Sequence, residues 1–249
     1  MHKLSIIGVC EPKLSMCDTD SIWMRLNFDH VVCNSSGDIW VFFSFPFISQ
    51  VIGNLDQHLS ILLGHLQFLC SFLVSFVQAK CTSFEMENLW GAFLRDKSSQ
   101  GPWFVVGDFN LIVSSGEKKG GRPYLPSEEL EFLNFMNEAG IFYTSFFGSR
   151  FTWCNNRHRR ARIWKRLDWL LVNMDCLNFS SKISVSHLVC DPLDHAPLLI
   201  SLSSRLDNKP RPFRILNVWT SKEGLLDVIK EVWQLDVTSS PFYVVWAKM

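Results

Sequence analysis

The sequence has 249 residues, of which 47% are hydrophobic and 19% charged; this composition excludes a chain disordered throughout and suits one large α/β domain or two small ones. Its 24 basic and 24 acidic residues balance, so the net charge does not favour a nucleic-acid partner, and only a local basic segment could bind one. The eight cysteines are scattered without a Cys-x-x-Cys pair, which gives little support to a zinc site and predicts reduced thiols in an intracellular protein.

The first half of the chain predicts mostly strands, because short apolar runs are separated by turn residues. Two helices interrupt them, one with an acidic start at 18–26 and one at 84–95 with an apolar face. The predicted strands cover 2–10, 31–33, 39–43, 58–63 and 68–79.

The apolar stretch Leu59–Val77 is long enough to span a membrane, and a membrane anchor is one alternative for this chain. Successive buried strands that turn at Gly64 would have the same composition. We therefore expect two core strands here and no membrane partner.

The second half continues the alternation of strands and helices up to Arg205. A helix is predicted over 127–139, capped by Ser127 and followed by Gly140. Strands are predicted at 103–109, 151–154, 164–172, 185–188 and 198–202. Beyond them, the polar, proline-containing segment 207–212 predicts a linker, and 222–235 predicts a helix. We therefore expect a domain over 1–205 and a linker with a partly helical tail over 206–249.

Polar groups that suit phosphodiester hydrolysis stand at the predicted strand ends. A hard cation such as Mg²⁺ prefers carboxylate oxygens, an acid can position or deprotonate a water, and a protonated histidine beside an acid binds phosphate. Each residue alone has a plainer interpretation as a turn, a helix cap or a surface ion pair. Only their recurrence in order indicates chemistry. The residues are Glu11, Asp108, Asn110, Asp168, Asp194 and His195.

These positions carry a family resemblance over roughly 1–202. The segments Val9–Lys13, Gly107–Asn110, Arg166–Trp169 and Leu193–Leu198 resemble, in order, the four motifs of endonuclease/exonuclease/phosphatase proteins. The resemblance implies a DNase I-like α/β fold, a four-layer sandwich of two mixed β-sheets flanked by helices. It also implies a metal-dependent endonuclease that hydrolyses DNA phosphodiester bonds with Mg²⁺ or Mn²⁺.

The resemblance implies a role for each site residue. Glu11 would bind the metal ion and Asp194 would assist that site. Asp108 would orient the attacking water or protonate the leaving oxygen, and Asn110 would hold the phosphate. His195 would contact the scissile phosphate, with its imidazole held in position by Asp168.

Further segments resemble the apurinic-type endonuclease of plant LINE non-LTR retrotransposons, which implies a nuclear protein. They are Phe151–Asn156, Val77–Cys81, Gly116–Gly121 and Phe213–Trp219. The chain departs from that pattern in three ways: it starts after the family's first strand, Gln78 replaces the usual Tyr, and Leu193 replaces the usual Ser. An inactive relic with weak nucleic-acid binding, or a family phosphatase or exonuclease, are therefore alternatives.

One basic segment provides the local positive charge. Grouped arginines in or near a turn can neutralise phosphates, although a solvated loop would have the same composition. Trp153 and Trp164 flank the segment and could stack on bases or belong to the core. The predicted nucleic-acid-binding residues are Arg157, Arg159, Arg160 and Arg162.

Overall fold

The computed structural model describes 4–15, 19–97, 101–124, 130–158, 161–180, 182–190 and 193–203, together with Gly224, Asp227, Lys230 and Glu231. The chain divides into two compact units, Met1–Leu206 and Asp207–Met249. The predicted linker at 207–212 lies outside the described residues, as does the predicted helix at 222–235 apart from those four.

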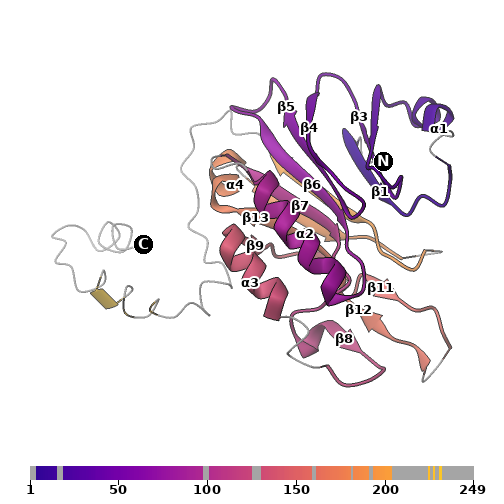
Figure 1. Ribbon diagram of the computed structural model, residues 1–249, viewed down its shortest axis with the longest axis vertical. Helices are drawn as coiled ribbons and strands as arrows, with labels where there is room; N and C mark the ends of the chain where they lie inside the picture. The colour runs from indigo at the N-terminus through magenta and orange to yellow at the C-terminus, as the bar shows by residue number, and fades with distance from the viewer. Residues whose placement is uncertain are drawn as a thin grey trace. The chain divides into compact units, whose positions relative to one another are not determined.

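A six-stranded mixed sheet forms the centre of the first unit (Figure 1). Only its β6–β7 pair is parallel; the other pairs are antiparallel. Its strands, in spatial order, are β4 (Ile48–Asn54), β5 (His58–Gly64), β6 (Phe72–Gln78), β7 (Trp103–Asp108), β13 (Asp168–Asn173) and β9 (Ile141–Tyr143).

A second β layer is divided into two three-stranded sheets. In the described part of the chain β1 pairs only with β3, and β15 pairs only with β14, so the layer is not one continuous sheet. One sheet has the order β1 (Ile6–Cys10), β3 (Ile39–Phe43), β2 (His30–Cys33), and the other β10 (Phe147–Gly148), β14 (Lys182–His187), β15 (Leu198–Ser203).

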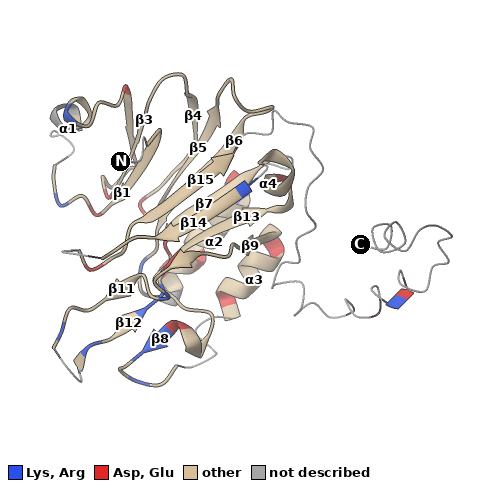
Figure 2. Cartoon of the chain, turned by 180° about the vertical axis from the view of Figure 1, so that it is seen from behind, with Lys and Arg blue, Asp and Glu red and all other residues tan. Residues whose placement is uncertain are grey.

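Helices cover both outer sides. α2 (Ser83–Asp96) and α3 (Leu130–Ala139) bury Trp90, Phe93 and Phe132 against the six-stranded sheet. α1 (Thr19–Leu26) packs Ile22 and Trp23 against the sheet that contains β1. α4 (Met174–Phe179) follows β13, and a short 3₁₀ helix spans Ser115–Glu117. The layers follow one another as helix, sheet, sheet and helix, which confirms the predicted fold class (Figures 1 and 2).

A small basic sheet extends from the sandwich. It contains β11 (Trp153–Cys154), β12 (Trp164–Lys165) and β8 (Lys118–Lys119) in that order. Its lysines and arginines form the densest group of blue segments in Figure 2.

The prediction of two core strands in Leu59–Val77 is confirmed, because β5 ends at Gly64 and β6 begins at Phe72. Within the described ranges, no helix has the length and apolar character needed to cross a bilayer. None of the described cysteines forms a disulfide.

Several predicted boundaries were wrong. The strand expected over 164–172 is interrupted, because β12 and β13 pair with different sheets. The strand expected from 68 begins only at Phe72, since 65–71 form turns. The strands β4, β8, β9 and β10 and the helix α4 were not predicted; β8 and β10 have two residues each, too few to show a period.

Candidate active site

Three side chains form a row across neighbouring strands at one end of the central sheet. Gln78 of β6 stands in register with Asp108 of β7, and Asp108 with Asp168 of β13. Residues in register on adjacent strands project from the same face of a sheet. The pairing of β6, β7 and β13 therefore delivers one amide and two carboxylates to a single edge.

The Gly-Asp-Phe-Asn segment is shaped by the parallel β6–β7 pair. Gly107 has a φ of +140°, and a Cβ there would overlap the backbone oxygen of Val77. Asn110 takes the left-handed conformation, with a φ of +54°, which asparagine tolerates better than most residues. Its Nδ2 donates to the oxygen of Ala79 at 2.7 Å, and its backbone N–H donates to Asp108 Oδ1 at 2.9 Å. Asn110 thus fixes Asp108 and the end of β6, and its amide nitrogen is already engaged.

His195 lies over the two carboxylates. Its Nδ1 is 2.9 Å from Asp168 Oδ2, and its Nε2 is 3.8 Å from Asp108 Oδ2. The loop that carries it is held against β11, because Cys154 N–H donates to Asp194 O and Ala196 N–H donates to Thr152 O. The prediction that Asp168 holds the imidazole matches this contact, and both carboxylates are largely buried while the imidazole is one-third exposed.

The pKa values of Asp108 and His195 are shifted by burial and by the charges around them. Burial, followed by the negative charge of Asp168, raises the pKa of Asp108 to about 7. Burial alone would lower the pKa of His195, but the hydrogen bond and charge of Asp168, with the charge of Asp108, raise it to about 9. The site therefore holds a protonated imidazole beside the carboxyl of Asp108, which can exchange a proton near neutral pH.

Glu11 lies at the other end of the row. It follows β1 in the left-handed conformation, with a φ of +49°. Its Oε1 accepts a hydrogen bond from Gln78 Nε2, and its Oε2 contacts the ammonium of Lys13. The chain's own donors thus occupy both oxygens of the predicted metal ligand.

The donor set fits a divalent cation in part. Asp108, Asp168 and His195 offer ligand atoms within 4.8 Å of one another. Glu11 joins that group only through Gln78, and its carboxylate is half exposed. Asp194 is exposed at a pocket beside Trp153 and is not one of the three grouped ligands. A hard cation would suit the surplus of carboxylates, and it would have to replace the exposed Lys13 ammonium at Glu11.

Thr152 is a site residue that our sequence reasoning missed. Its hydroxyl accepts the backbone N–H groups of Leu167 at 2.9 Å and Asp168 at 3.1 Å, and it is 1% exposed. Its backbone oxygen accepts the N–H of Ala196 at 2.6 Å. The one sequence signal was its place in Phe-Thr-Trp, directly before the basic turn. Gln78 and Lys13 were likewise not predicted to contact Glu11.

The predicted nucleic-acid-binding arginines are only partly described. Arg157 is exposed, and Arg162 donates from Nε to the Arg157 oxygen at 2.9 Å while it covers the Trp164 ring at 5.6 Å. Arg159 and Arg160 lie outside the described residues.

The fold is a DNase I-like sandwich, and the acid-and-histidine site lies at one edge of its central sheet. The endonuclease domain of TRAS1, a telomere-specific non-LTR retrotransposon, is similar with a TM-score of 0.53 and 13% identity, over 80% of this chain and 98% of that one. The 3′ phosphatase NExo from Neisseria, bound to a product DNA hairpin, has a TM-score of 0.55 and 15% identity over 80% and 89%. A beta toxin from Staphylococcus aureus has a TM-score of 0.53 and 10% identity over 80% and 87%.

At these identities the likeness establishes the fold alone. No protein-family model matches the sequence, and no curated protein matches it significantly.

Proposed function

We propose that this chain is a metal-dependent phosphodiesterase that nicks DNA. The observation that carries the proposal is the placement of His195 over Asp108 and Asp168 at the edge of a DNase I-like sandwich. Two similar structures support a nucleic-acid substrate, since one is a retrotransposon endonuclease domain and the other a 3′ phosphatase bound to DNA. The plant LINE branch and a nuclear location belong to the same proposal and rest on the sequence segments.

The chain's own groups can perform hydrolysis. Water attacks phosphorus, the bond to the leaving oxygen breaks, and one proton passes from the water to that oxygen. Asp108, with its pKa raised to about 7, can accept the proton of the water. Protonated His195 can donate a hydrogen bond to a phosphate oxygen as negative charge develops there. Bound Mg²⁺ or Mn²⁺, which Glu11 would hold, would supply further stabilisation of that charge.

One observation favours the alternative of an inactive relic. The oxygens of Glu11 are engaged by Gln78 and Lys13, so a cation has to compete for its ligand. A phosphatase is the other alternative, because the same groups could act on a terminal phosphate.

Conversion of supercoiled plasmid to nicked circles tests the proposal. We expect nicking with Mg²⁺ and its loss with EDTA. Asp108→Asn and His195→Ala should each lower the rate by roughly a hundredfold or more, because groups that act as a unit fail together. The exposed residues Asp56 and His30 provide matched controls, Asp56→Asn and His30→Ala, which should retain the rate.

Nicking that persists in EDTA, or that both site variants retain, would contradict the assignment. An oligonucleotide with a 3′-phosphate separates the alternatives: phosphate release without plasmid nicking identifies a phosphatase, and neither reaction identifies the relic.

A further inference from the structure

A second row of side chains leads away from His195 across the small basic sheet. Trp153 of β11 forms an antiparallel bridge with His195 and stands opposite Lys165 of β12. Lys165 in turn stands opposite Lys118 of β8. Residues directly opposite one another in antiparallel strands project from the same face. The face therefore presents histidine, tryptophan, lysine and lysine in one line.

The distances and exposures agree with this register. The ring centroids of His195 and Trp153 are 6.5 Å apart, and Lys165 Nζ is 6.0 Å from the Trp153 centroid. All four side chains are partly exposed. Neighbouring strands lie about 4.8 Å apart, so the row spans about 14 Å, the rise of roughly four nucleotides along a DNA strand.

The opposite face of the same sheet has a different character. The adjacent register places Lys119, Trp164 and Cys154 in line. Cys154 is buried, and Trp164 is covered by Arg162. Lys119 and Trp164 thus project from the other face and provide matched comparisons for the lysines and the tryptophan of the row.

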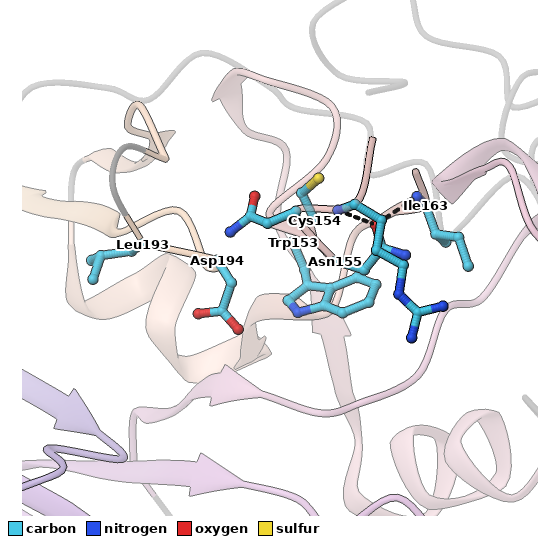
Figure 3. A pocket seen from close by; sticks show the side chains of 8 residues that line it. Trp153, Cys154, Asn155, Ile163, Leu193 and Asp194 are labelled. Carbon is cyan, nitrogen blue, oxygen red and sulfur yellow. Dashed lines mark hydrogen bonds between the residues drawn. The ribbon is translucent and has the colours of Figure 1, made fainter. Parts of the chain in front are cut away.

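A pocket of about 730 Å³ is lined by Trp153, and Figure 3 shows the indole next to Asp194. Ligand pockets commonly have volumes of this order. Leu193 is 58% exposed and adds apolar surface, while Asn156 and Arg157 add polar groups. An aromatic face, an apolar neighbour and polar edges suit a nucleobase.

We infer that this row, defined as Lys118, Lys165 and Trp153, binds the DNA strand that leaves the scissile phosphate. The inference rests on the proposed function. Trp153 stacks on the unpaired base next to the phosphate at His195, in the pocket beside Leu193. Lys165 and Lys118 neutralise the following phosphates. The described residues of this sheet offer no acidic side chain on the row's face to oppose them.

Binding of a fluorescein-labelled single-stranded DNA oligonucleotide in EDTA, measured by anisotropy over a range of salt concentrations, tests the two lysines without cleavage. Lys118→Ala and Lys165→Ala should each reduce the slope of log K against log salt by about 0.7, the value for one phosphate contact on a single strand. Lys119→Ala, on the opposite face, should leave the slope unchanged. Equal effects of Lys118→Ala and Lys119→Ala would overturn the assignment of the face.

The tryptophan is tested with the same oligonucleotide and with one that lacks bases throughout. Trp153→Leu should weaken binding of the normal strand by about 5-fold to 150-fold, since stacking contributes about 1–3 kcal/mol per base. Binding of the baseless strand should not change. Trp153→Phe keeps a stacking ring and should retain most of the affinity, and Trp164→Leu should bind as the wild type does. A loss that is equal on both strands, or equal in Trp164→Leu, would contradict the base subsite.

The outcomes for the row and for the nuclease are distinguishable. If the protein nicks plasmid in Mg²⁺ but the variants show none of these effects, the proposed function stands and the inference about the row is wrong. If the variants show these effects in EDTA but the protein never nicks plasmid, the inference about the row stands and the catalytic proposal is wrong. Absence of any DNA binding by the wild type overturns the row.

Discussion

Thr152 joins the strand that carries Asp168 to the loop that carries His195 through its hydroxyl and its backbone carbonyl. It accepts two backbone N–H groups at the start of β13, while the Thr152 carbonyl holds Ala196 beside His195. Because β11 alternates, Thr152 and Cys154 project into the core and Trp153 projects outward. One short strand therefore positions the Asp–His pair and also presents the tryptophan proposed to contact a base.

Thr152→Val tests whether the Thr152 hydroxyl positions the Asp168–His195 pair. It keeps the shape but leaves two buried N–H groups without an acceptor, at a cost of roughly 1–3 kcal/mol in the free energy of unfolding. We expect kcat to fall by roughly a hundredfold with KM little changed, because a misplacement of about 1 Å has that effect. Thr152→Ser keeps the hydroxyl and should restore both quantities, measured by urea unfolding and plasmid nicking. A full kcat in Thr152→Val would show that this hydroxyl does not position the pair.

Lys13 occupies an oxygen of the predicted metal ligand. Its ammonium contacts Glu11 Oε2, and the side chain is 80% exposed. An exposed ion pair is weak, so Lys13 competes only modestly with a divalent cation.

Lys13→Ala should therefore tighten Mn²⁺ binding by up to about fivefold, because an exposed ion pair is weak and its loss frees one oxygen of Glu11. Isothermal titration calorimetry on the whole chain measures this without reference to activity. Lys80 lines the same cavity and is the matched control. The Mn²⁺ affinity of Lys80→Ala should differ less from that of the wild type than the affinity of Lys13→Ala does. If Lys13→Ala weakens binding, Glu11 is not the ligand with which Lys13 competes.

At the scale of elements, α2 is anchored to the sheet by a hydrogen bond at its C-terminal end. Asp96 Oδ2 lies 2.7 Å from Nε2 of the buried His58 at the start of β5. Gly53 of β4 leaves the space for this carboxylate, because a Cβ there would overlap it. The helix begins at a Thr82 cap that accepts the N–H of Glu85, so both ends of α2 are fixed by polar contacts.

The anchor makes stability depend on pH. Burial alone would raise the pKa of Asp96, but hydrogen bonds from His58 and Ser60 lower it below its ordinary value. Such a carboxyl contributes stability above its unfolded pKa of about 3.9, and the contribution is lost as pH falls through the folded pKa. We expect the free energy of unfolding to fall more between neutral and acidic pH in the wild type than in Asp96→Asn. Urea unfolding followed by circular dichroism measures this, with the exposed Asp56→Asn as control; equal falls in all three would refute the anchor.

At the scale of the whole molecule, the first unit ends where the strand pattern ends. β15 ends at Ser203, and the first compact unit ends at Leu206. The polar, proline-containing segment 207–212 predicts a linker at this place.

Limited proteolysis should therefore cut first near Lys209 or Arg211. A linker makes few contacts with a domain core and offers its backbone to a protease. Mass spectrometry of the first fragments with trypsin identifies the site. The segment Phe104–Asn110 contains the end of β7 and two site residues, so first cleavage inside it would mean that the domain boundary is misplaced. Earlier cleavage at Lys3 would not contradict the boundary.

The sequence by itself determined the elements with a clear period and the polar groups at their ends. The apolar run of β7 predicts a buried strand, and Asp108 stands at its end. The α2 helix was predicted within one residue at each end, because its apolar face repeats at helical spacing. These features depend on neighbours in the chain, so local propensity carries them.

Only the tertiary structure decided which groups meet. The parallel pairing of β6 with β7 places Gln78 beside Asp108, and the two-residue strands β8, β11 and β12 align Lys118 and Lys165 with Trp153. Strands of two residues have no period to detect, and their register is set by partners far away in the chain. The contact of Lys13 and Gln78 with Glu11 and the division of the second β layer depend in the same way on long-range pairing. Local sequence patterns therefore located the acids and the histidine, and strand pairing decided what each of them touches.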